Sequence, residues 1–233
     1  MRLGIFGGTF NPVHDGHLRT AEEARYKLRL DKVIFVPSGT PPLKETDTVA
    51  SSHRFAMVKL AVASNKDFIV SDLEAGKQGK TYTVDTLRKL RKEFPGDVMY
   101  FILGVDAFLE LPKWRQPEEL TGLADFAIVS RPGFRLDDVV NSPYIKGADT
   151  EEVNREVSGK KMIRTLADSR PAVHQLRSYR LASGRRAFLV PVTRLDISST
   201  DIRHLIEQKR SIKYLLPLSV ERYIKKHKLY LKT

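Results

Sequence analysis

Residues 1–20 constrain the fold more than any other part of this sequence, because they join a short apolar run to two glycines and then to a helical pattern. The apolar residues at 3–6 predict a strand, Gly7 and Gly8 end it, and the apolar spacing after residue 14 predicts a helix. Glycines let the backbone approach an anion closely, and the N–H groups of a first helical turn point at it. The stretch therefore predicts a phosphate-binding turn.

Two histidines, His14 and His17, stand at the predicted helix start in the pattern His-x-Gly-His. A spacing of three places them on one helical face, and Gly16 leaves that face open. Imidazoles there can donate hydrogen bonds to phosphate oxygens, and the helix dipole favours the same anion. The pair could instead bind a metal, which would need a third ligand, or lie on the surface. The length of the surrounding motif favours phosphate.

The rest of the chain alternates apolar runs with helical patterns, which predicts an α/β fold. The predicted architecture is a Rossmann-like open parallel sheet with helices on both faces and right-handed crossovers. The predicted strands after the first lie at 32–37, 68–70, 98–103, 126–129 and 187–192, and the predicted helices at 51–63, 81–94 and 117–124. Serine at the start of 51–63 and Thr83 are expected to cap their helices.

One domain is expected to span residues 1–233. Residues of about 134–186 are polar and weakly periodic, which predicts a peripheral insertion with some helix, and the C-terminal end is predicted to be a basic helix. The chain has no cysteine, which excludes disulfides and thiolate chemistry and fits the reducing cytoplasm. No apolar run approaches the ~20 residues of a membrane span, so we expect a cytoplasmic protein without a membrane partner.

The formal net charge is +12, and residues 203–233 carry nine Lys or Arg against two Glu. Such a chain suits anionic partners, either nucleic acid or small phosphates. The basic end could also be a solvated helix face. It lacks the interleaved aromatic residues that stack on bases, so no nucleic-acid partner is expected.

Two further groups have the chemistry of a nucleotide site. Gly104 and Asp106 follow the most apolar predicted strand, where open parallel sheets bind ligands. A second anion site is predicted at the start of a late helix, from the hydroxyls and guanidinium of Ser198, Ser199, Thr200 and Arg203. Lys44, in a loop after the second strand, is a candidate phosphate contact or an ordinary solvated lysine.

These motifs resemble the bacterial nicotinate-nucleotide adenylyltransferase family of the His-x-Gly-His nucleotidyltransferase superfamily. The first and last motifs are shared across the superfamily, and the Thr-Tyr-Thr-x-Asp-Thr-Leu and Gly-x-Asp…Trp segments point to the pyridine-nucleotide branch. The matching segments are Gly7-Gly-Thr-Phe-Asn-Pro-Val-His-Asp-Gly-His17, Pro41-Pro-Leu-Lys44, Ser52-His-Arg-Phe-Ala-Met57, Thr81-Tyr-Thr-Val-Asp-Thr-Leu87, Gly104-Val-Asp-Ala107 with Trp114, Arg131-Pro-Gly133 and Ile197-Ser-Ser-Thr-Asp-Ile-Arg203.

The resemblance implies that ATP and nicotinate mononucleotide give deamido-NAD and pyrophosphate by in-line attack on the α-phosphate, with Mg²⁺ bridging phosphate oxygens. It implies a monomer or small homo-oligomer. The implied catalytic residues are His14, His17, Lys44 and Arg203. The implied ATP-binding residues are Gly8, Thr9, Phe10, Gly16, Gly104, Asp106, Ser198, Ser199 and Thr200, and the implied nicotinate-mononucleotide-binding residues are Tyr82, Thr83 and Trp114.

The chain departs from the family pattern at Asn11, where Asp is more common, and at Leu43, where His is more common. The segment between Gly133 and Ile197 is also longer than usual. Four alternatives stay open. They are another enzyme of the superfamily such as the pantetheine-phosphate adenylyltransferase, a preference for nicotinamide mononucleotide, a nucleic-acid binder, and a nucleotide sensor that has lost catalysis.

Overall fold

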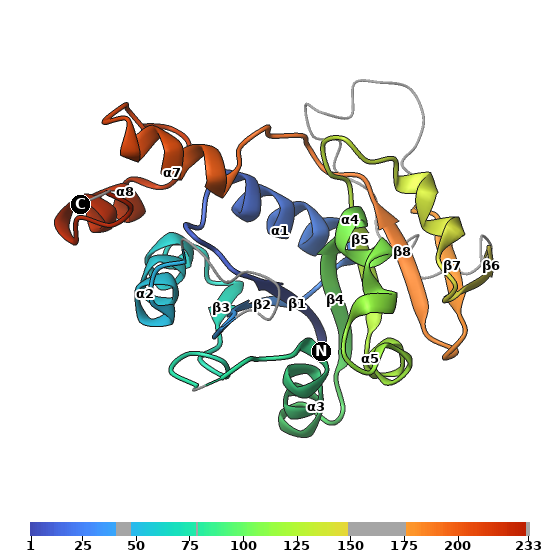
Figure 1. Cartoon of the computed structure of the whole chain (residues 1–233). Helices are drawn as coiled ribbons and strands as arrows, with labels where there is room; N and C mark the ends of the chain where they lie inside the picture. The colour runs from blue at the N-terminus through green and yellow to red at the C-terminus, as the bar shows by residue number, and fades with distance from the viewer. Residues whose placement is uncertain (41–47, 78, 149–175, 232–233) are drawn as a thin grey trace.

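The computed structural model describes residues 1–40, 48–77, 79–148 and 176–231. Within these ranges eight strands form one sheet in the order β3-β2-β1-β4-β5-β8-β7-β6 (Figure 1). The six parallel strands are β1 (Arg2–Gly8), β2 (Lys32–Pro37), β3 (Phe68–Val70), β4 (Val98–Gly104), β5 (Asp125–Val129) and β8 (Arg186–Val190). Two antiparallel pairings add β7 (Ser178–Leu181) and β6 (Ile145–Ala148) at one edge.

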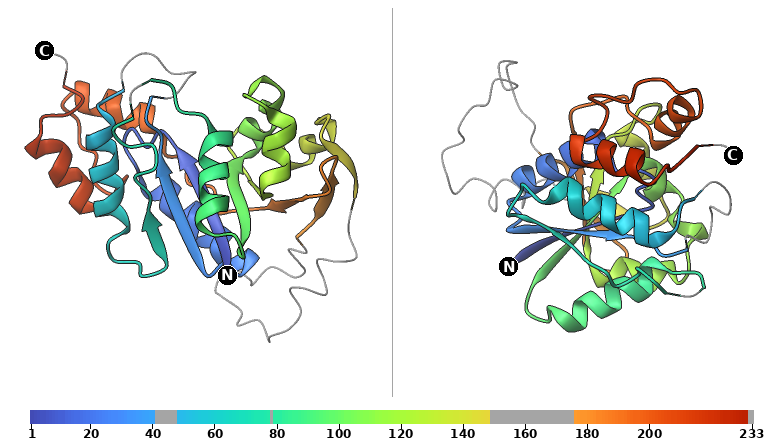
Figure 2. Two further views of the ribbon diagram at one scale, coloured as in Figure 1. Left: turned by 90° about the horizontal axis from the view of Figure 1, so that it is seen from below. Right: turned by 90° about the vertical axis from the view of Figure 1, so that its left-hand side faces the viewer.

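Helices cover both faces of this sheet (Figure 2). One face carries α1 (Asp15–Leu28), α2 (Ser51–Val62), α7 (Ser199–Glu207) and α8 (Leu218–Lys226). The other carries α3 (Thr83–Glu93), α4 (Val105–Leu109), α5 (Pro117–Leu123) and the 3₁₀ turn η1 (Leu111–Lys113). The predicted Rossmann-like fold is confirmed. None of the described helices is long and apolar enough to cross a membrane.

The side-chain alternation of the strands divides the core in two. On β4, Tyr100 and Ile102 face the α1 layer, whereas Met99 and Phe101 face the α3 layer. A strand covered on both faces has to be apolar throughout, and this explains the unbroken run at 98–103.

Two predicted caps are wrong. Ala50, not Ser51, is the N-cap of α2, and the Ser51 hydroxyl instead accepts the N–H of Gly76 at 3.5 Å. Tyr82 is the N-cap of α3, which makes Thr83 its first helical residue.

The predicted insertion at 134–186 is only partly described, since residues 149–175 lie outside the described ranges. Its described part holds the 3₁₀ helix η2 (Leu136–Asn141) and strands β6 and β7, which extend the sheet. The expectation of some helix is met by η2 alone there, and the two strands were not predicted. The single-domain organisation stays a prediction.

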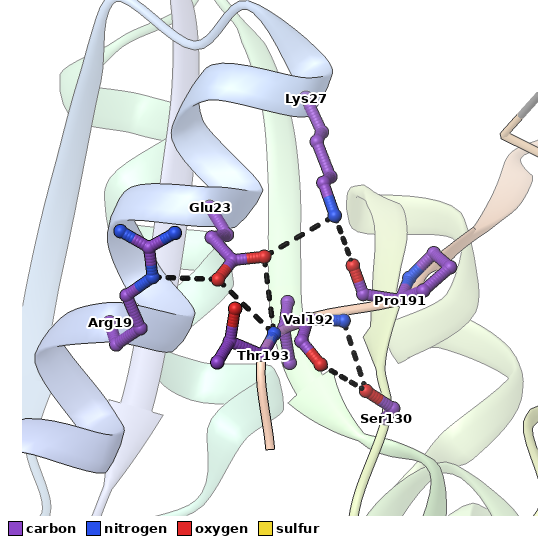
Figure 3. A network of polar contacts seen from close by, with 7 residues as sticks. All are labelled: Arg19, Glu23, Lys27, Ser130, Pro191, Val192 and Thr193. Carbon is purple, nitrogen blue, oxygen red and sulfur yellow. Dashed lines mark hydrogen bonds and ion pairs between the residues drawn. The ribbon is translucent and has the colours of Figure 1, made fainter. Parts of the chain in front are cut away.

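A polar network fastens the chain after β8 to helix α1 (Figure 3). Glu23 of α1 accepts the backbone N–H of Thr193 at 3.1 and 3.2 Å, and Lys27 donates to the carbonyl of Pro191 at 2.5 Å. Ser130, just after β5, exchanges two hydrogen bonds with Val192. The network fixes the path from the sheet to α7, which carries the second predicted anion motif.

Candidate active site

The sheet order reverses between β1 and β4, because the chain moves outward through β2 and β3 on one side and through β5 on the other. Ligands of open α/β sheets bind beyond the carboxyl ends of the strands at such a point. Gly8 ends β1 and Gly104 ends β4, and the register of Phe6 with Ile102 places those ends side by side. A Cβ on Gly104 would lie 2.2 Å from Asp106 Oδ1 and 2.7 Å from Arg131 Nε, so glycine lets these two side chains lie over the end of β4.

The loop after β1 is held by its carbonyl oxygens. The Thr9 carbonyl accepts from Arg54 at 2.8 Å, and the Asn11 carbonyl accepts from Arg203 at 2.9 Å. The Pro12 carbonyl accepts the Ser199 hydroxyl at 2.8 Å. Two helices distant in sequence therefore fix the geometry of the glycine turn and of the residues that lead into α1.

His14 is the N-cap of α1 and His17 lies one turn further on, with ring centroids 3.7 Å apart. The backbone N–H of His14 donates to His17 Nδ1 at 3.3 Å. Because Nδ1 accepts, the ring proton of neutral His17 is on Nε2. The loop thereby sets His17 as an Nε2–H donor.

His14 is 4% exposed, and its pKa is lowered from 6.5 to about 4, first by burial and then by the charge of Arg131. The imidazole is therefore neutral at physiological pH. Within the described residues its Nδ1 is buried without a hydrogen-bond partner. A Cβ on Gly16 would lie 3.0 Å from that atom, which explains the glycine between the histidines.

Arg131, which follows β5, faces Asp106 across 3.8 Å, too far for a hydrogen bond. Asp106 Oδ1 and Arg131 Nε are both buried without hydrogen-bond partners in the described part of the chain. Such atoms are commonly satisfied by a ligand or water. The sequence predicted no role at the site for Arg131. The residue appeared there only as part of the Arg-Pro-Gly motif.

The start of α7 meets the first motif. Ser198 caps α7 by accepting the N–H of Asp201 at 3.0 Å and donates to the Asp201 carboxylate at 2.6 Å. Arg203 reaches both the Asn11 carbonyl and Thr200 Oγ1, the latter at 3.5 Å. The structure therefore joins the two predicted anion motifs, 180 residues apart in the sequence, into one region.

Tyr82, Thr83 and Trp114 lie on the α3 side of the sheet, opposite the histidine pair. The Arg115 guanidinium lies over the Tyr82 ring at 4.6 Å, and Trp114 packs edge-on against Phe101 at 6.3 Å. A ligand that contacts both the histidine pair and these three residues would have to pass over the carboxyl ends of the strands, since the two sets lie on opposite faces of the sheet. Lys44 and Leu43, the remaining predicted positions, lie outside the described residues.

Sequence reasoning missed Arg54, which is 1% exposed. Its guanidinium donates to the carbonyls of Val49, Thr9 and Gly39 and to the Ser38 hydroxyl at 3.3 Å. The motif Ser52–Met57 contains Arg54, but its partners belong to loops that only the fold brings near.

Asn11 was a departure from the family pattern, and its side-chain oxygen here accepts the Val49 N–H at 3.3 Å and the Tyr230 hydroxyl at 2.9 Å.

Comparison with solved structures agrees with this architecture. The nicotinic acid mononucleotide adenylyltransferase of Plasmodium falciparum, complexed with NaAD, aligns with a TM-score of 0.70 at 19% identity, over 98% of this chain and 97% of that one. The same protein complexed with APC gives a TM-score of 0.68 at 18% identity, over 98% and 96%. At these identities the likeness concerns the fold.

Sequence comparison gives the family. The cytidylyltransferase-like family model matches residues 5–205. Two proteins named as nicotinate-nucleotide adenylyltransferases are similar over 99% of this chain. That of Syntrophotalea carbinolica is 42% identical over 97% of its own length, and that of Geobacter sp. strain M21 is 40% identical over 98%. This chain belongs to the nicotinate-nucleotide adenylyltransferase family of enzymes.

Proposed function

We propose that this protein joins ATP and nicotinate mononucleotide to form deamido-NAD and pyrophosphate, in cytoplasmic NAD biosynthesis. Membership of the family supports the activity. The observation that carries it at the level of residues is the close histidine pair at the start of α1, with the two rings tilted by 36°. It lies beside a loop held by Arg54 and Arg203, at the point where the sheet order reverses.

The acceptor is a phosphate that is already anionic at neutral pH, so the reaction needs no general base. An oxygen of the acceptor phosphate attacks the α-phosphorus of ATP in line, the new P–O bond forms, and the bond to the β-phosphate oxygen breaks. Pyrophosphate leaves with that electron pair. Catalysis then consists of positioning and of donors aimed at the phosphate oxygens.

His14 and His17 donate hydrogen bonds to the triphosphate in this proposal. Because burial keeps His14 neutral, it acts as a dipolar donor rather than as a cation. The fixed tautomer of His17 presents Nε2–H. The positive charge at the leaving end comes from Arg203, with Ser198, Ser199 and Thr200 beside it, and Lys44 would offset charge where the two phosphates meet.

The nucleosides would lie on either side of the end of β1. Gly8, Thr9, Phe10, Gly16 and Gly104 would line the ATP. The Asp106 carboxylate oxygen, which accepts no hydrogen bond from the described residues, suits a ribose hydroxyl. On the other face Tyr82, Thr83 and Trp114 would hold the pyridine ring. Arg131 Nε, buried beside Asp106, is added to this set as an N–H donor that makes no hydrogen bond within the described residues.

Magnesium would arrive as the ATP complex. The described residues contain no group of three or more His, Cys, Asp or Glu side chains that could hold a metal ion. They do not fit a resident metal, so phosphate oxygens and water would supply its ligands. We propose no nucleic-acid or membrane partner and a monomer or small homo-oligomer.

Pyrophosphate release with ATP and Mg²⁺ tests the function directly, with nicotinate mononucleotide in one reaction and nicotinamide mononucleotide in another. Strong preference for the acid acceptor is the expected result. Equal rates with the two mononucleotides would make the protein a dual-specificity enzyme. In a third reaction 4′-phosphopantetheine is the acceptor, and release of pyrophosphate only in that reaction would assign the protein to another branch of the superfamily. Tight ATP binding without release from any acceptor would indicate a sensor.

A further inference from the structure

The C-terminal segment contacts the loop between β1 and α1, which begins at the two glycines and is called the glycine-turn loop below. Tyr230 lies four residues beyond the end of α8, and its hydroxyl donates to Asn11 Oδ1 at 2.9 Å across 219 positions of sequence. Helix α8 packs against α2, and both lie beside α7 at the same end of the molecule (Figures 1 and 2). The buried Leu229 anchors the segment immediately before the tyrosine.

The Tyr230 hydroxyl has the properties of a fixed donor. Burial raises the pKa of the phenol despite the nearby charges of Arg203 and Arg54, so it stays protonated at neutral pH. Its backbone has φ of +64°, in the left-handed region that non-glycine residues rarely occupy. Phe10, one residue before Asn11, has φ of +49°. One residue with an uncommon backbone conformation therefore donates this hydrogen bond, and another directly precedes its acceptor; such conformations cluster at functional sites.

Asn11 is the point at which three distant segments hold the loop. Its side-chain oxygen accepts from Tyr230 and from the backbone of Val49, just before α2, while its carbonyl accepts from Arg203 of α7. The residue is 5% exposed, so loss of one partner would leave part of a buried acceptor unsatisfied. His14 lies three residues further along the same loop.

We propose that Tyr230 is a positioning residue for the triphosphate of ATP. By holding Asn11 it fixes the loop that presents His14 and His17, so the last residues of the chain help to preorganise the site formed by the first. The inference rests on the proposed function for its ligand, ATP. It assigns Tyr230 no contact with the substrate.

Tyr230→Phe removes the hydroxyl and keeps the ring. A matched control lies on the preceding helix, where Tyr223 makes the same kind of bond to His53 Nδ1 at 3.0 Å, remote in sequence from the loop. Both variants lose one phenolic hydrogen bond. Only Tyr230→Phe loses one to the glycine-turn loop.

The experiment measures the Kd of ATP by calorimetry, the KM of each substrate and the Tm. Tyr230→Phe is expected to weaken ATP binding about fivefold and to raise the KM for ATP more than that for nicotinate mononucleotide. Tyr223→Phe is expected to leave the Kd and the KM for ATP within twofold of the wild-type values. Asn11→Ala completes a double-mutant cycle in which the combined loss is smaller than the product of the single losses.

ATP binding within twofold of wild type in Tyr230→Phe would overturn the proposal. So would equal weakening in both tyrosine variants, or fully multiplicative losses in the cycle, since either indicates a general structural effect. If wild type binds ATP but makes no deamido-NAD, the proposed function fails, while the ATP affinities of the variants still decide the role of Tyr230.

Discussion

At the scale of single residues, the two histidines of the shared motif have different surroundings. His14 is buried and carries a lowered pKa, whereas His17 is partly exposed and accepts a hydrogen bond from the His14 backbone. In the proposed mechanism His14 therefore acts as a neutral donor placed at a helix start. In His17 the loop determines which ring nitrogen donates, because the His14 N–H occupies Nδ1 and leaves the proton on Nε2.

His17→Ala is expected to lower kcat by about 10²- to 10³-fold, the range seen when one donor to a developing oxyanion is removed. The fold should survive, because the side chain is only partly buried. Pyrophosphate release and circular dichroism measure the two effects. His53→Ala is the control, since His53 contacts Tyr223 and His227 instead of the loop. A kcat near wild type would remove His17 from the mechanism.

His14 should make stability depend on pH. Its pKa is about 4 in the folded protein against 6.5 for the free side chain, so the unfolded chain binds more protons between those values. Stability from this residue is complete above pH 6.5 and is lost as the pH falls towards 4. The loss between pH 7 and pH 5 is about 2 kcal/mol.

Urea unfolding of wild type and His14→Gln at both pH values isolates this contribution. Glutamine keeps a polar side chain that does not titrate, so its stability should fall less than that of wild type by about 2 kcal/mol. Parallel pH dependence in the two proteins would mean that the histidine is not desolvated as the structure indicates.

At the scale of elements, helix α1 has two separate structural roles. Its N-terminus carries the histidines, and its middle turn carries Glu23, which holds the chain between β8 and α7. Burial raises the pKa of Glu23, but hydrogen bonds from Thr193 and Arg19 and the charge of Lys27 outweigh it, and the net pKa is lowered. The carboxylate form therefore stabilises the fold.

Glu23→Gln is expected to lower the free energy of unfolding by about 2 kcal/mol, because charge-assisted hydrogen bonds to a buried residue are lost. Glu22→Gln is the matched control one position along the helix. Its pair with Arg25 is more exposed and should be worth about 0.5 kcal/mol. Chemical denaturation at pH 7 compares them, and equal losses would contradict a special role for the Thr193 contact.

Local patterns predicted the elements well and their contacts poorly. The run at 98–103 and the spacing of apolar residues in α1 depend on burial of each element, so the sequence contains them. The capping residues failed because the fold places Ala50 and Tyr82 at the helix starts instead. Strands β6 and β7 were missed because they add to an existing edge and have little apolar periodicity of their own.

At the scale of the whole molecule, the candidate site is assembled from both ends of the chain. Gly8 and Tyr230 lie in segments that touch the same loop, and Arg54 and Arg203 reach it from α2 and α7. The motifs predicted segments with phosphate chemistry, and the structure brings the first motif and the start of α7 together; their roles stay a prediction. The motifs could not predict Arg54 or Tyr230, whose contribution is a contact with a backbone or side chain far along the sequence.

The net charge of +12 should accelerate the capture of two anionic substrates. Raising KCl from about 20 to about 200 mM shortens the screening length roughly threefold, so kcat/KM for both substrates is expected to fall severalfold while kcat changes little. Sucrose at matched osmolality is the control. If the basic end contributes to this field, Lys226→Gln with Lys228→Gln should lower kcat/KM about twofold at low salt and not at high salt. A wild-type kcat/KM independent of salt would show that the positive charge has no part in substrate encounter and belongs to the solvated surface alone.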